Sequence, residues 1–204
     1  MSRGAPEETR AALVTYARRL FAERGYSGTA IEDIVIAAGS TRSALHHHFA
    51  DKNDLFRAVF DQIAHEVDSR VNQSASTAKE AGSALRLACH AWLDACLDPE
   101  VLRILVIDAP SALGWEEWRR LDAPYAAAAL RERLHAAMHD GAIPRQPVAP
   151  LALLLAGALR EAALDIANAP DRRASRRVVG RAFDSLLDGL QRMAAPPDFM
   201  RGRS

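Results

Sequence analysis

The chain has 204 residues, with 26 basic and 26 acidic side chains, a formal net charge of zero and 49% hydrophobic residues. This composition can fill a sizeable core, and the length exceeds the roughly 100–150 residues that are commonest for one domain. Zero net charge argues against strong non-specific attraction to nucleic acid. The most apolar run, residues 148–159, is too short to span a bilayer. We therefore expect a cytoplasmic two-domain chain with no membrane partner and no targeting segment.

The first helix is expected over residues 9–24. Leu13, Ala17 and Phe21 recur at helical spacing and form one apolar stripe. Gly25 follows directly, which is typical of the left-handed position after a helix end. This helix can cover the two shorter helices that follow it.

The pattern of residues 31–49 predicts two short helices joined by a turn at Gly39. The first helix places four apolar residues on one stripe, namely Ile31, Ile34, Val35 and Ala38. The second helix is expected to begin at Arg42 and to bury Leu45 and Phe49, which leaves small, polar and cationic side chains exposed. Such a helix-turn-helix can place its second helix in the major groove of DNA.

Polar residues mark the starts of these helices. Thr29 and Glu32 have the spacing of a capping box at the start of the first helix. Ser40 and Thr41 can accept hydrogen bonds from the free N–H groups of the second helix. Residues 51–54 are expected to cap a long helix that follows.

The expected contacts with DNA lie on the second short helix and at its borders. A cation at the start of a recognition helix points at base edges or phosphate, and Lys52, in the first turn of the next helix, can also meet a phosphate. The predicted DNA-binding residues are Thr29, Thr41, Arg42, Ser43, Ala44, His46, His47 and Lys52.

Neither the histidine run nor the cysteines indicate a metal site or a disulfide. His46, His47 and His48 are consecutive, and consecutive helical side chains point about 100° apart, so they cannot converge on one ion. Cys89 and Cys96 are seven residues apart on one helix, a rise of about 10 Å, which is too far for a disulfide. The cysteines are expected to be buried apolar residues, or else thiols that line a cavity or sense oxidation.

Beyond residue 70 the pattern is helical throughout, with no strand signal. Residues 115–140 read as one long helix that contains Pro124. A proline removes one backbone hydrogen bond and clashes with the preceding turn, so a kink is expected near Leu121.

The last two helices, expected over residues 149–168 and 172–193, favour a dimer interface. The first is apolar nearly all round, so it can bury one face in its own domain and another against a second copy in a four-helix bundle. The alternative is a fully buried hairpin in the core. The predicted interface residues are Leu151, Leu155, Leu159, Ala163, Phe183, Leu186 and Leu190.

A ligand cavity is expected among the middle helices, where aromatic side chains gather near a few polar groups. The aromatic residues could equally be ordinary core residues. The candidate ligand-binding residues are Trp92, Cys96, Asp108, Trp115, Trp118, Tyr125, Arg160, Glu161 and Asn168.

Several of these motifs together resemble the TetR family of transcriptional regulators. The resemblance spans roughly residues 7–60 and is specific, because it fixes residue types and spacings over three helices. It is carried by Thr9-Arg10, Leu20-Phe21-Ala22-Glu23-Arg24-Gly25-Tyr26, Thr29, Ile34, Ala38-Gly39, Leu45, His48-Phe49, Lys52 and Leu55. A softer resemblance covers residues 108–119 and 186–190.

The resemblance implies an all-α protein: a three-helix DNA-binding domain over residues 7–54, with its helix-turn-helix at about 30–49, and a helical regulatory and dimerisation domain over 55–194. It also implies a homodimer on a palindromic operator, more often a repressor, released by a small apolar or aromatic effector. Three departures bear on operator affinity: His46 replaces the usual tyrosine, Ser40 a small aliphatic residue, and Ile36 a polar one.

Two other classes of function compete with this one. An enzyme is not expected, because the sequence has no nucleophile elbow, phosphate loop, metal pair or dinucleotide fingerprint, and no cofactor is implied. The second rival is a helical dimer that signals through a protein partner and whose DNA binding is weakened by the three departures.

Overall fold

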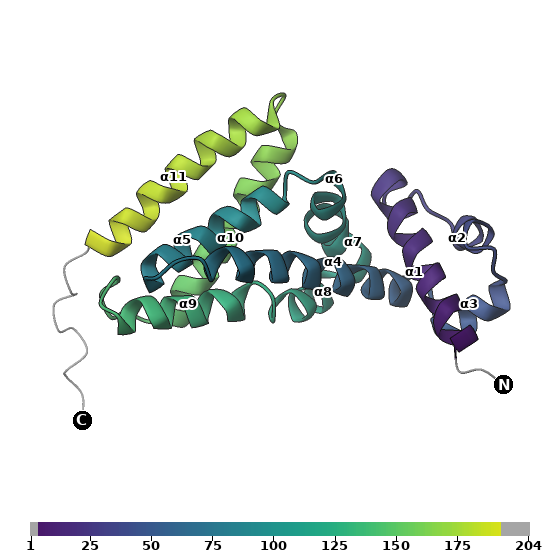
Figure 1. Ribbon diagram of the computed structural model, residues 1–204. Helices are drawn as coiled ribbons and strands as arrows, with labels where there is room; N and C mark the ends of the chain where they lie inside the picture. The colour runs from purple at the N-terminus through teal and green to yellow at the C-terminus, as the bar shows by residue number, and fades with distance from the viewer. Residues whose placement is uncertain (1–3, 193–204) are drawn as a thin grey trace. The chain divides into compact units, whose positions relative to one another are not determined.

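The computed structural model describes residues 4–192, which are helical with no strand among them (Figure 1). Short turns or loops connect most of the helices. Their bounds are α1 Gly4–Arg24, α2 Ile31–Ala37, α3 Arg42–His48, α4 Lys52–Ala75, α5 Ala81–Ala95, α6 Pro99–Val101, the π-helix η1 Leu102–Asp108, α7 Ala109–Leu113, α8 Trp115–Asp122, α9 Ala127–His139, α10 Val148–Asn168 and α11 Arg172–Arg192. The prediction of an all-α fold is confirmed.

The helices form two compact units. The first contains the chain up to Glu66 together with Asp98–Leu121, and the second contains Val67–Leu97 and the helices from Asp122 onward. The long helix α4 therefore contributes its first part to one unit and its last part to the other. No helix within residues 4–192 has an apolar stretch of the length that a bilayer crossing requires.

The core of the first unit lies among α1, α2, α3 and the start of α4. Phe21 of α1 and Phe56 of α4 meet edge to face, with their ring centroids 5.2 Å apart, and both side chains are fully buried. Ile34 and Leu45 bring α2 and α3 onto the same core. Aromatic pairs in this geometry stabilise a core beyond the area that they bury.

Ion pairs and a backbone contact join α1 to the segment after Asp98. The guanidinium of Arg18 contacts Glu66 of α4 at 2.6 Å and Glu100 of α6 at 2.7 Å. The backbone N–H of Tyr26 donates to Oδ2 of Asp108 at 2.8 Å. A bidentate guanidinium fixes orientation as well as distance, so Arg18 ties α1 to α6 and to the part of α4 that belongs to this unit.

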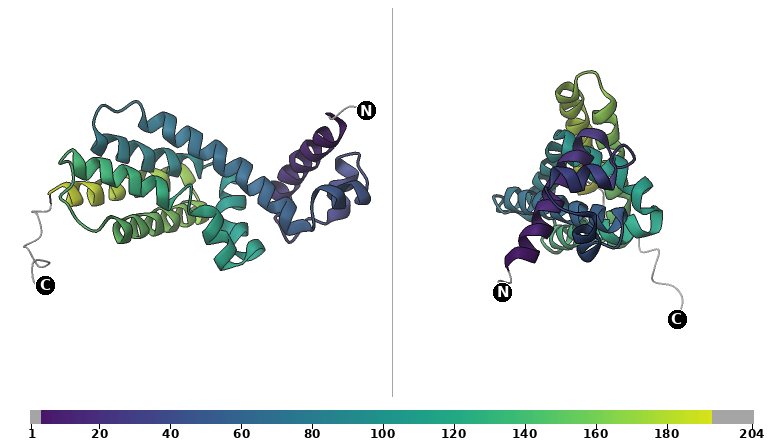
Figure 2. Two further views of the ribbon diagram at one scale, coloured as in Figure 1. Left: turned by 90° about the horizontal axis from the view of Figure 1, so that it is seen from below. Right: turned by 90° about the vertical axis from the view of Figure 1, so that its right-hand side faces the viewer.

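The core of the second unit lies among α5, α9, α10 and α11. Leu93 of α5, Leu134 of α9 and Leu155 of α10 are buried together with Phe183 of α11. Figures 1 and 2 show α10 and α11 as an antiparallel hairpin, with α5 and α9 packed beside them.

A glycine and a proline interrupt the helices after Leu113. Gly114 has a φ of +80° and separates α7 from α8. The kink expected near Leu121 is instead a complete break: α8 ends at Asp122 and α9 begins at Ala127. Pro124 has no N–H group to continue the helix, and the N–H groups of Tyr125 and Ala126 both donate to the carbonyl of Asp122.

Candidate nucleic-acid interface

The turn between α2 and α3 is formed by Gly39 and Thr41. Gly39 has a φ of +58°, and Oγ1 of Thr41 accepts a hydrogen bond from the N–H of Ala44 at 3.1 Å, which confirms the predicted turn and this helix cap. Leu45 is fully buried and Phe49, just after α3, is 2% exposed. These two buried side chains determine which face of α3 is exposed to solvent.

The outward face of α3 carries the predicted cations and small residues. Arg42, Ser43, His46 and His47 are exposed, and Ala44 is half-buried. A short helix with small and cationic side chains on its free face can enter a major groove without steric obstruction. The structure thus gathers most of the predicted contacts on one surface.

Lys52 lies at the start of α4, next to an aromatic ring. Its Nζ is 4.1 Å from the ring centroid of Tyr26, and burial lowers the pKa of Lys52 below its usual value. The hydroxyl of Tyr26 donates to Oδ1 of Asn53. The N–H of Asp54 donates to Oδ1 of Asp51 at 2.8 Å, which caps α4 as expected. The ring and the cap hold the lysine at the helix start, where a phosphate is favoured.

The role predicted for Thr29 is wrong. Its side chain is 1% exposed, and Oγ1 donates to the carbonyls of Leu20 at 3.2 Å and Gly25 at 2.8 Å. It therefore cannot reach DNA, and it does not form the expected capping box, since α2 starts after Ala30 with no side-chain cap. Thr29 instead satisfies the carbonyls at the end of α1.

The positions of Ser40 and Ile36 also differ from what the turn needs. Oγ of Ser40 is buried and has no hydrogen-bond partner, so the cap is made by Thr41 alone. Ile36 is 78% exposed. An unsatisfied buried hydroxyl costs stability, and an exposed isoleucine gains none.

The predicted ligand residues fall in both units. Asp108, Trp115 and Trp118 belong to the first unit. The carboxylate of Asp108 accepts a hydrogen bond from the N–H of Tyr26, and the ring centroids of the two tryptophans are 5.0 Å apart. Trp118 is buried, whereas Trp115 is 58% exposed. Trp115 lines a hollow of about 540 Å³ together with Glu116, Glu117 and Arg120 among others.

The remaining ligand candidates lie in the second unit. Arg160 forms an ion pair with Asp122 at 3.4 Å; burial raises the pKa of Asp122, and Arg160 partly opposes the rise. Trp92 packs against the core and Tyr125 is half-buried, but Glu161 and Asn168 are exposed. Burial raises the pKa of the Cys96 thiol to about 12.

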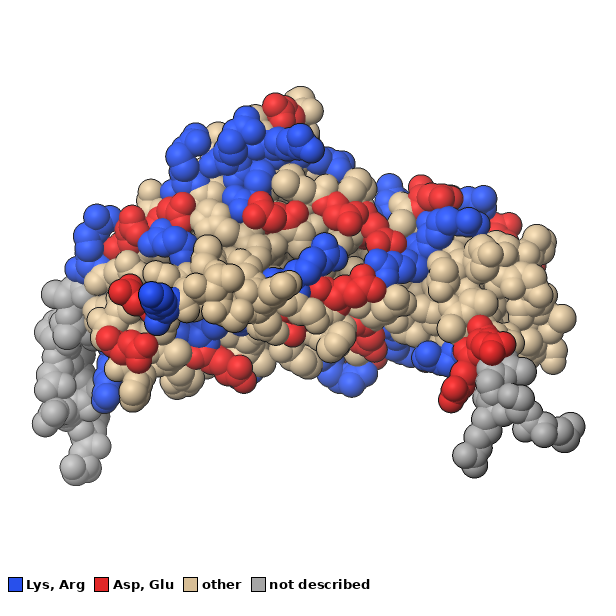
Figure 3. Space-filling view, viewed as in Figure 1, with Lys and Arg blue, Asp and Glu red and all other residues tan. Residues whose placement is uncertain are grey.

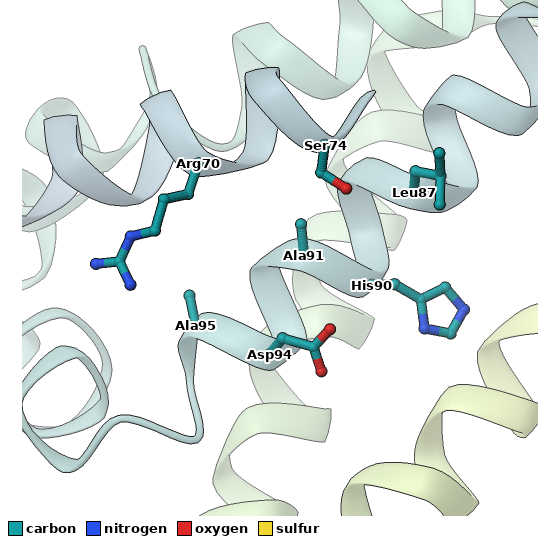
Figure 4. A pocket seen from close by; sticks show the side chains of 7 residues that line it. All are labelled: Arg70, Ser74, Leu87, His90, Ala91, Asp94 and Ala95. Carbon is teal, nitrogen blue, oxygen red and sulfur yellow. The ribbon is translucent and has the colours of Figure 1, made fainter. Parts of the chain in front are cut away.

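A pocket of about 370 Å³ opens between α4 and α5 and was not predicted. Figure 4 shows its lining: Arg70, Ser74, Leu87, His90, Ala91, Asp94 and Ala95. None of the predicted ligand residues lines it. The only sequence signal was the spacing of His90 and Asp94, which places both on one side of α5.

A polar network connects this pocket to α11. Arg176 is 9% exposed, and its Nη2 is 3.0 Å from both Nδ1 and the carbonyl oxygen of His90, while its Nε is 2.8 Å from Asp94. Nε2 of His90 lies 2.8 Å from Asp184. Arg86 contacts the same Asp184 at 2.7 Å. Side chains far apart in sequence therefore join α5 to α11.

The dimer residues predicted from the sequence need correction. Leu155, Leu159, Ala163 and Phe183 are buried in the second unit itself, because the small and branched residues of α5 and α9 pack against them. Leu151 and Leu190 are half-buried, and Leu186 is 46% exposed. The large apolar side chains that α10 and α11 leave exposed are the predicted Leu186 and three residues that were not predicted, Leu153, Leu154 and Val178.

Basic side chains gather over the first half of α11, as the blue area at the top of Figure 3 shows. They are Arg172, Arg173, Arg177 and Arg181, all exposed. The acidic residues Asp184 and Asp188, later in the same helix, are engaged by Arg86. The zero net charge thus hides a local excess of positive charge on this helix.

The geometry defines a class of protein: a helical chain whose first unit presents a helix-turn-helix suited to DNA. Residues 13–59 match the family model "Bacterial regulatory proteins, tetR family", and residues 83–190 match "Tetracyclin repressor-like, C-terminal domain". The second match alone covers more than half of the chain. The chain therefore belongs to the TetR family of bacterial transcriptional regulators.

Individual relatives agree with this assignment. A TetR-family regulator of known structure from Pectobacterium atrosepticum is 35% identical over 93% of this chain and 97% of its own, with a TM-score of 0.78. The regulator TtgR of Pseudomonas putida is 32% identical over 100 residues, which is 48% of each protein, so the match spans about half of its length. RolR, solved in complex with resorcinol, has the same fold at 17% identity, with a TM-score of 0.69 over 96% of this chain and 99% of RolR.

Proposed function

We propose that this chain is a homodimeric, ligand-responsive transcriptional regulator that binds a palindromic operator, more often as a repressor. The observation that carries the proposal is the free face of α3, where Arg42, Ser43, His46 and His47 are exposed beside the start of α4. Such a regulator works on chromosomal DNA in the cytoplasm.

In this proposal α3 enters the major groove and the neighbouring residues position it. Arg42 contacts a base edge or a phosphate, and His46 donates to phosphate, more strongly when protonated. Lys52 meets the backbone from the start of α4. Phosphate contacts provide affinity and register, whereas the side chains that reach base edges provide sequence preference.

The dimer forms through α10 and α11. Leu153 and Leu154 of α10 and Val178 and Leu186 of α11 are exposed apolar side chains that a second copy can cover. Gly157 and Gly189 have no other atom near the position of a Cβ, so a partner helix can approach closely there. In a two-fold symmetric dimer, the α3 helices of the two subunits then contact two half-sites about one turn of DNA, or about 34 Å, apart.

The effector enters the pocket between α4 and α5. Its volume of about 370 Å³ suits a small molecule, with Leu87, Ala91 and Ala95 as an apolar surface. His90 and Asp94 line the pocket and also bind Arg176 of α11. A ligand there can change the packing of a proposed dimer helix, and its differential affinity for two conformers sets the size of the response.

The test is selection of genomic fragments by the purified chain, followed by sequencing of the retained fragments. Enrichment of one inverted repeat is the expected result. If no fragment is enriched at any salt concentration, with or without cell extract as a source of effector, the DNA-binding proposal fails. The alternative of a helical dimer with a protein partner is then favoured.

A further inference from the structure

The cation expected to meet DNA is already paired within the chain. Nη1 of Arg42 is 2.7 Å from Oε1 of Glu32, and the two side chains are 67% and 58% exposed. Glu32 lies in the first turn of α2 and Arg42 at the first residue of α3. The pair therefore bridges the two helices of the helix-turn-helix on its water-facing side.

Local electrostatics favour this pairing. A carboxylate in the first turn of a helix is stabilised by the free N–H groups there, whereas a cation at the first residue of a helix is not. Glu32 is thus well placed, and the unfavourable position of Arg42 is compensated by a carboxylate 2.7 Å away. The guanidinium must leave Glu32, or share it, before it can contact a DNA oxygen.

We propose that Glu32 acts as an intramolecular competitor of DNA for Arg42, and so lowers operator affinity. The proposal rests on the proposed DNA-binding function. When Arg42 turns to a base edge or phosphate, the ion pair is lost and Glu32 faces the polyanion with no partner for its charge. Both effects weaken the complex on every sequence that engages Arg42, so Glu32 lowers affinity for those sequences.

Exposed pairs of this kind are weak, which limits the expected effect. Removing the carboxylate in Glu32→Gln should raise affinity by up to about fivefold for each subunit. Salt screens exposed charges, so the gain should shrink as ionic strength rises. A moderate reduction in affinity of this size suits a regulator that has to dissociate from its operator.

The neighbouring residue supplies a matched control. Asp33 lies next to Glu32 on α2 and pairs with Arg24 at 3.0 Å, with side-chain exposures of 43% and 51%. Asp33→Asn removes the same charge from the same helix but leaves the pair of Glu32 and Arg42 intact. It therefore measures the general benefit of one carboxylate fewer near DNA.

The experiment is a double-mutant cycle with a fluorescein-labelled duplex carrying the selected fragment and a second duplex of mixed sequence. Affinities of wild type, Glu32→Gln, Arg42→Ala and the double variant are measured by anisotropy at three salt concentrations. We expect Glu32→Gln to gain more than Asp33→Asn, and the excess to vanish when Arg42 is alanine. Circular dichroism and thermal melting confirm that each variant is folded.

Two results would overturn the proposal. An equal gain from Glu32→Gln with and without Arg42 would mean that Glu32 only repels phosphate directly. No gain over Asp33→Asn would mean that the pair does not compete with DNA. If the wild-type chain binds neither duplex, the proposed function itself fails, whereas binding without coupling refutes only the role of Glu32.

Discussion

Arg42 and Arg176 show how differently the two units use the same side chain. Arg42 is on the surface of the first unit, with one exposed carboxylate as its partner. Arg176 is buried in the second unit, where it contacts a histidine ring, a backbone carbonyl and Asp94. An exposed arginine with one exposed partner can exchange that partner and serve binding, whereas a buried arginine with several partners on another helix serves packing.

The same contrast holds for apolar side chains within a single helix. Leu154 and Leu155 are neighbours on α10, yet Leu154 is 70% exposed and Leu155 is 2% exposed. One faces a proposed partner subunit and the other faces the core of its own unit. Substitutions at such matched positions separate assembly from folding.

The largest effect is expected at Leu155. Leu155→Ala should lower the free energy of unfolding by about 2–5 kcal/mol, because it leaves a cavity in the core. Leu154→Glu should leave the unfolding of the monomer nearly unchanged but shift the chain from dimer to monomer, as measured by sedimentation velocity. A dimer that survives Leu154→Glu at micromolar concentration would place the interface elsewhere.

The next effect concerns the two arginines. Arg176→Ala should cost about 2–3 kcal/mol in urea unfolding, since it removes the hydrogen bond from a charged group to the carbonyl of His90 and the ion pair with Asp94. Arg42→Ala should change stability by no more than about 0.5 kcal/mol, as is usual for an exposed side chain. Equal costs for the two variants would contradict the contrast drawn between them.

The two lysines of the chain offer a smaller, electrostatic test. Lys52→Gln should weaken binding to all DNA sequences alike and lower the slope of log affinity against log salt by about 1 per contact. Lys79, exposed and in the second unit, serves as the control in Lys79→Gln. Sequence-selective weakening by Lys52→Gln would argue for a base contact instead.

The smallest effects are expected at two adjacent hydroxyls. Ser40→Ala should stabilise the chain by about 1 kcal/mol, because the buried Oγ has no partner. Thr41→Ala should destabilise it by a similar amount, because the cap of α3 is lost. Thermal unfolding of both variants checks the pair, and a loss of stability in Ser40→Ala would show that its hydroxyl does find a partner.

The sequence predicted what is decided locally. Gly39, Thr41 and the apolar stripe of α2 follow from turn chemistry and helical spacing, so the helix-turn-helix was found at the right residues. Thr29 was misassigned because its hydroxyl donates backwards, to the carbonyls of Leu20 in α1 and of Gly25 just after it. The spacing of Thr29 and Glu32 indicated a cap for the helix that follows, whereas the side chain completes the end of the helix before it.

The second unit was harder to predict for a related reason. The helix α10 is apolar nearly all round, so periodicity could not tell Leu154 from Leu155. His90, which lines the pocket, contacts Arg176, and the two residues lie 86 positions apart in sequence. The ligand prediction followed the aromatic residues, whereas the pocket between α4 and α5 is lined by small and charged side chains.

The most direct test is the affinity of wild type and Arg42→Ala for the duplex recovered by genomic selection, measured at one fixed salt concentration. If α3 binds in the major groove, Arg42→Ala should lose about 1–3 kcal/mol of binding free energy for each subunit, with the stability of the fold unchanged. Equal affinity of the two proteins would contradict it, because the one arginine of α3 would then contribute nothing to DNA binding.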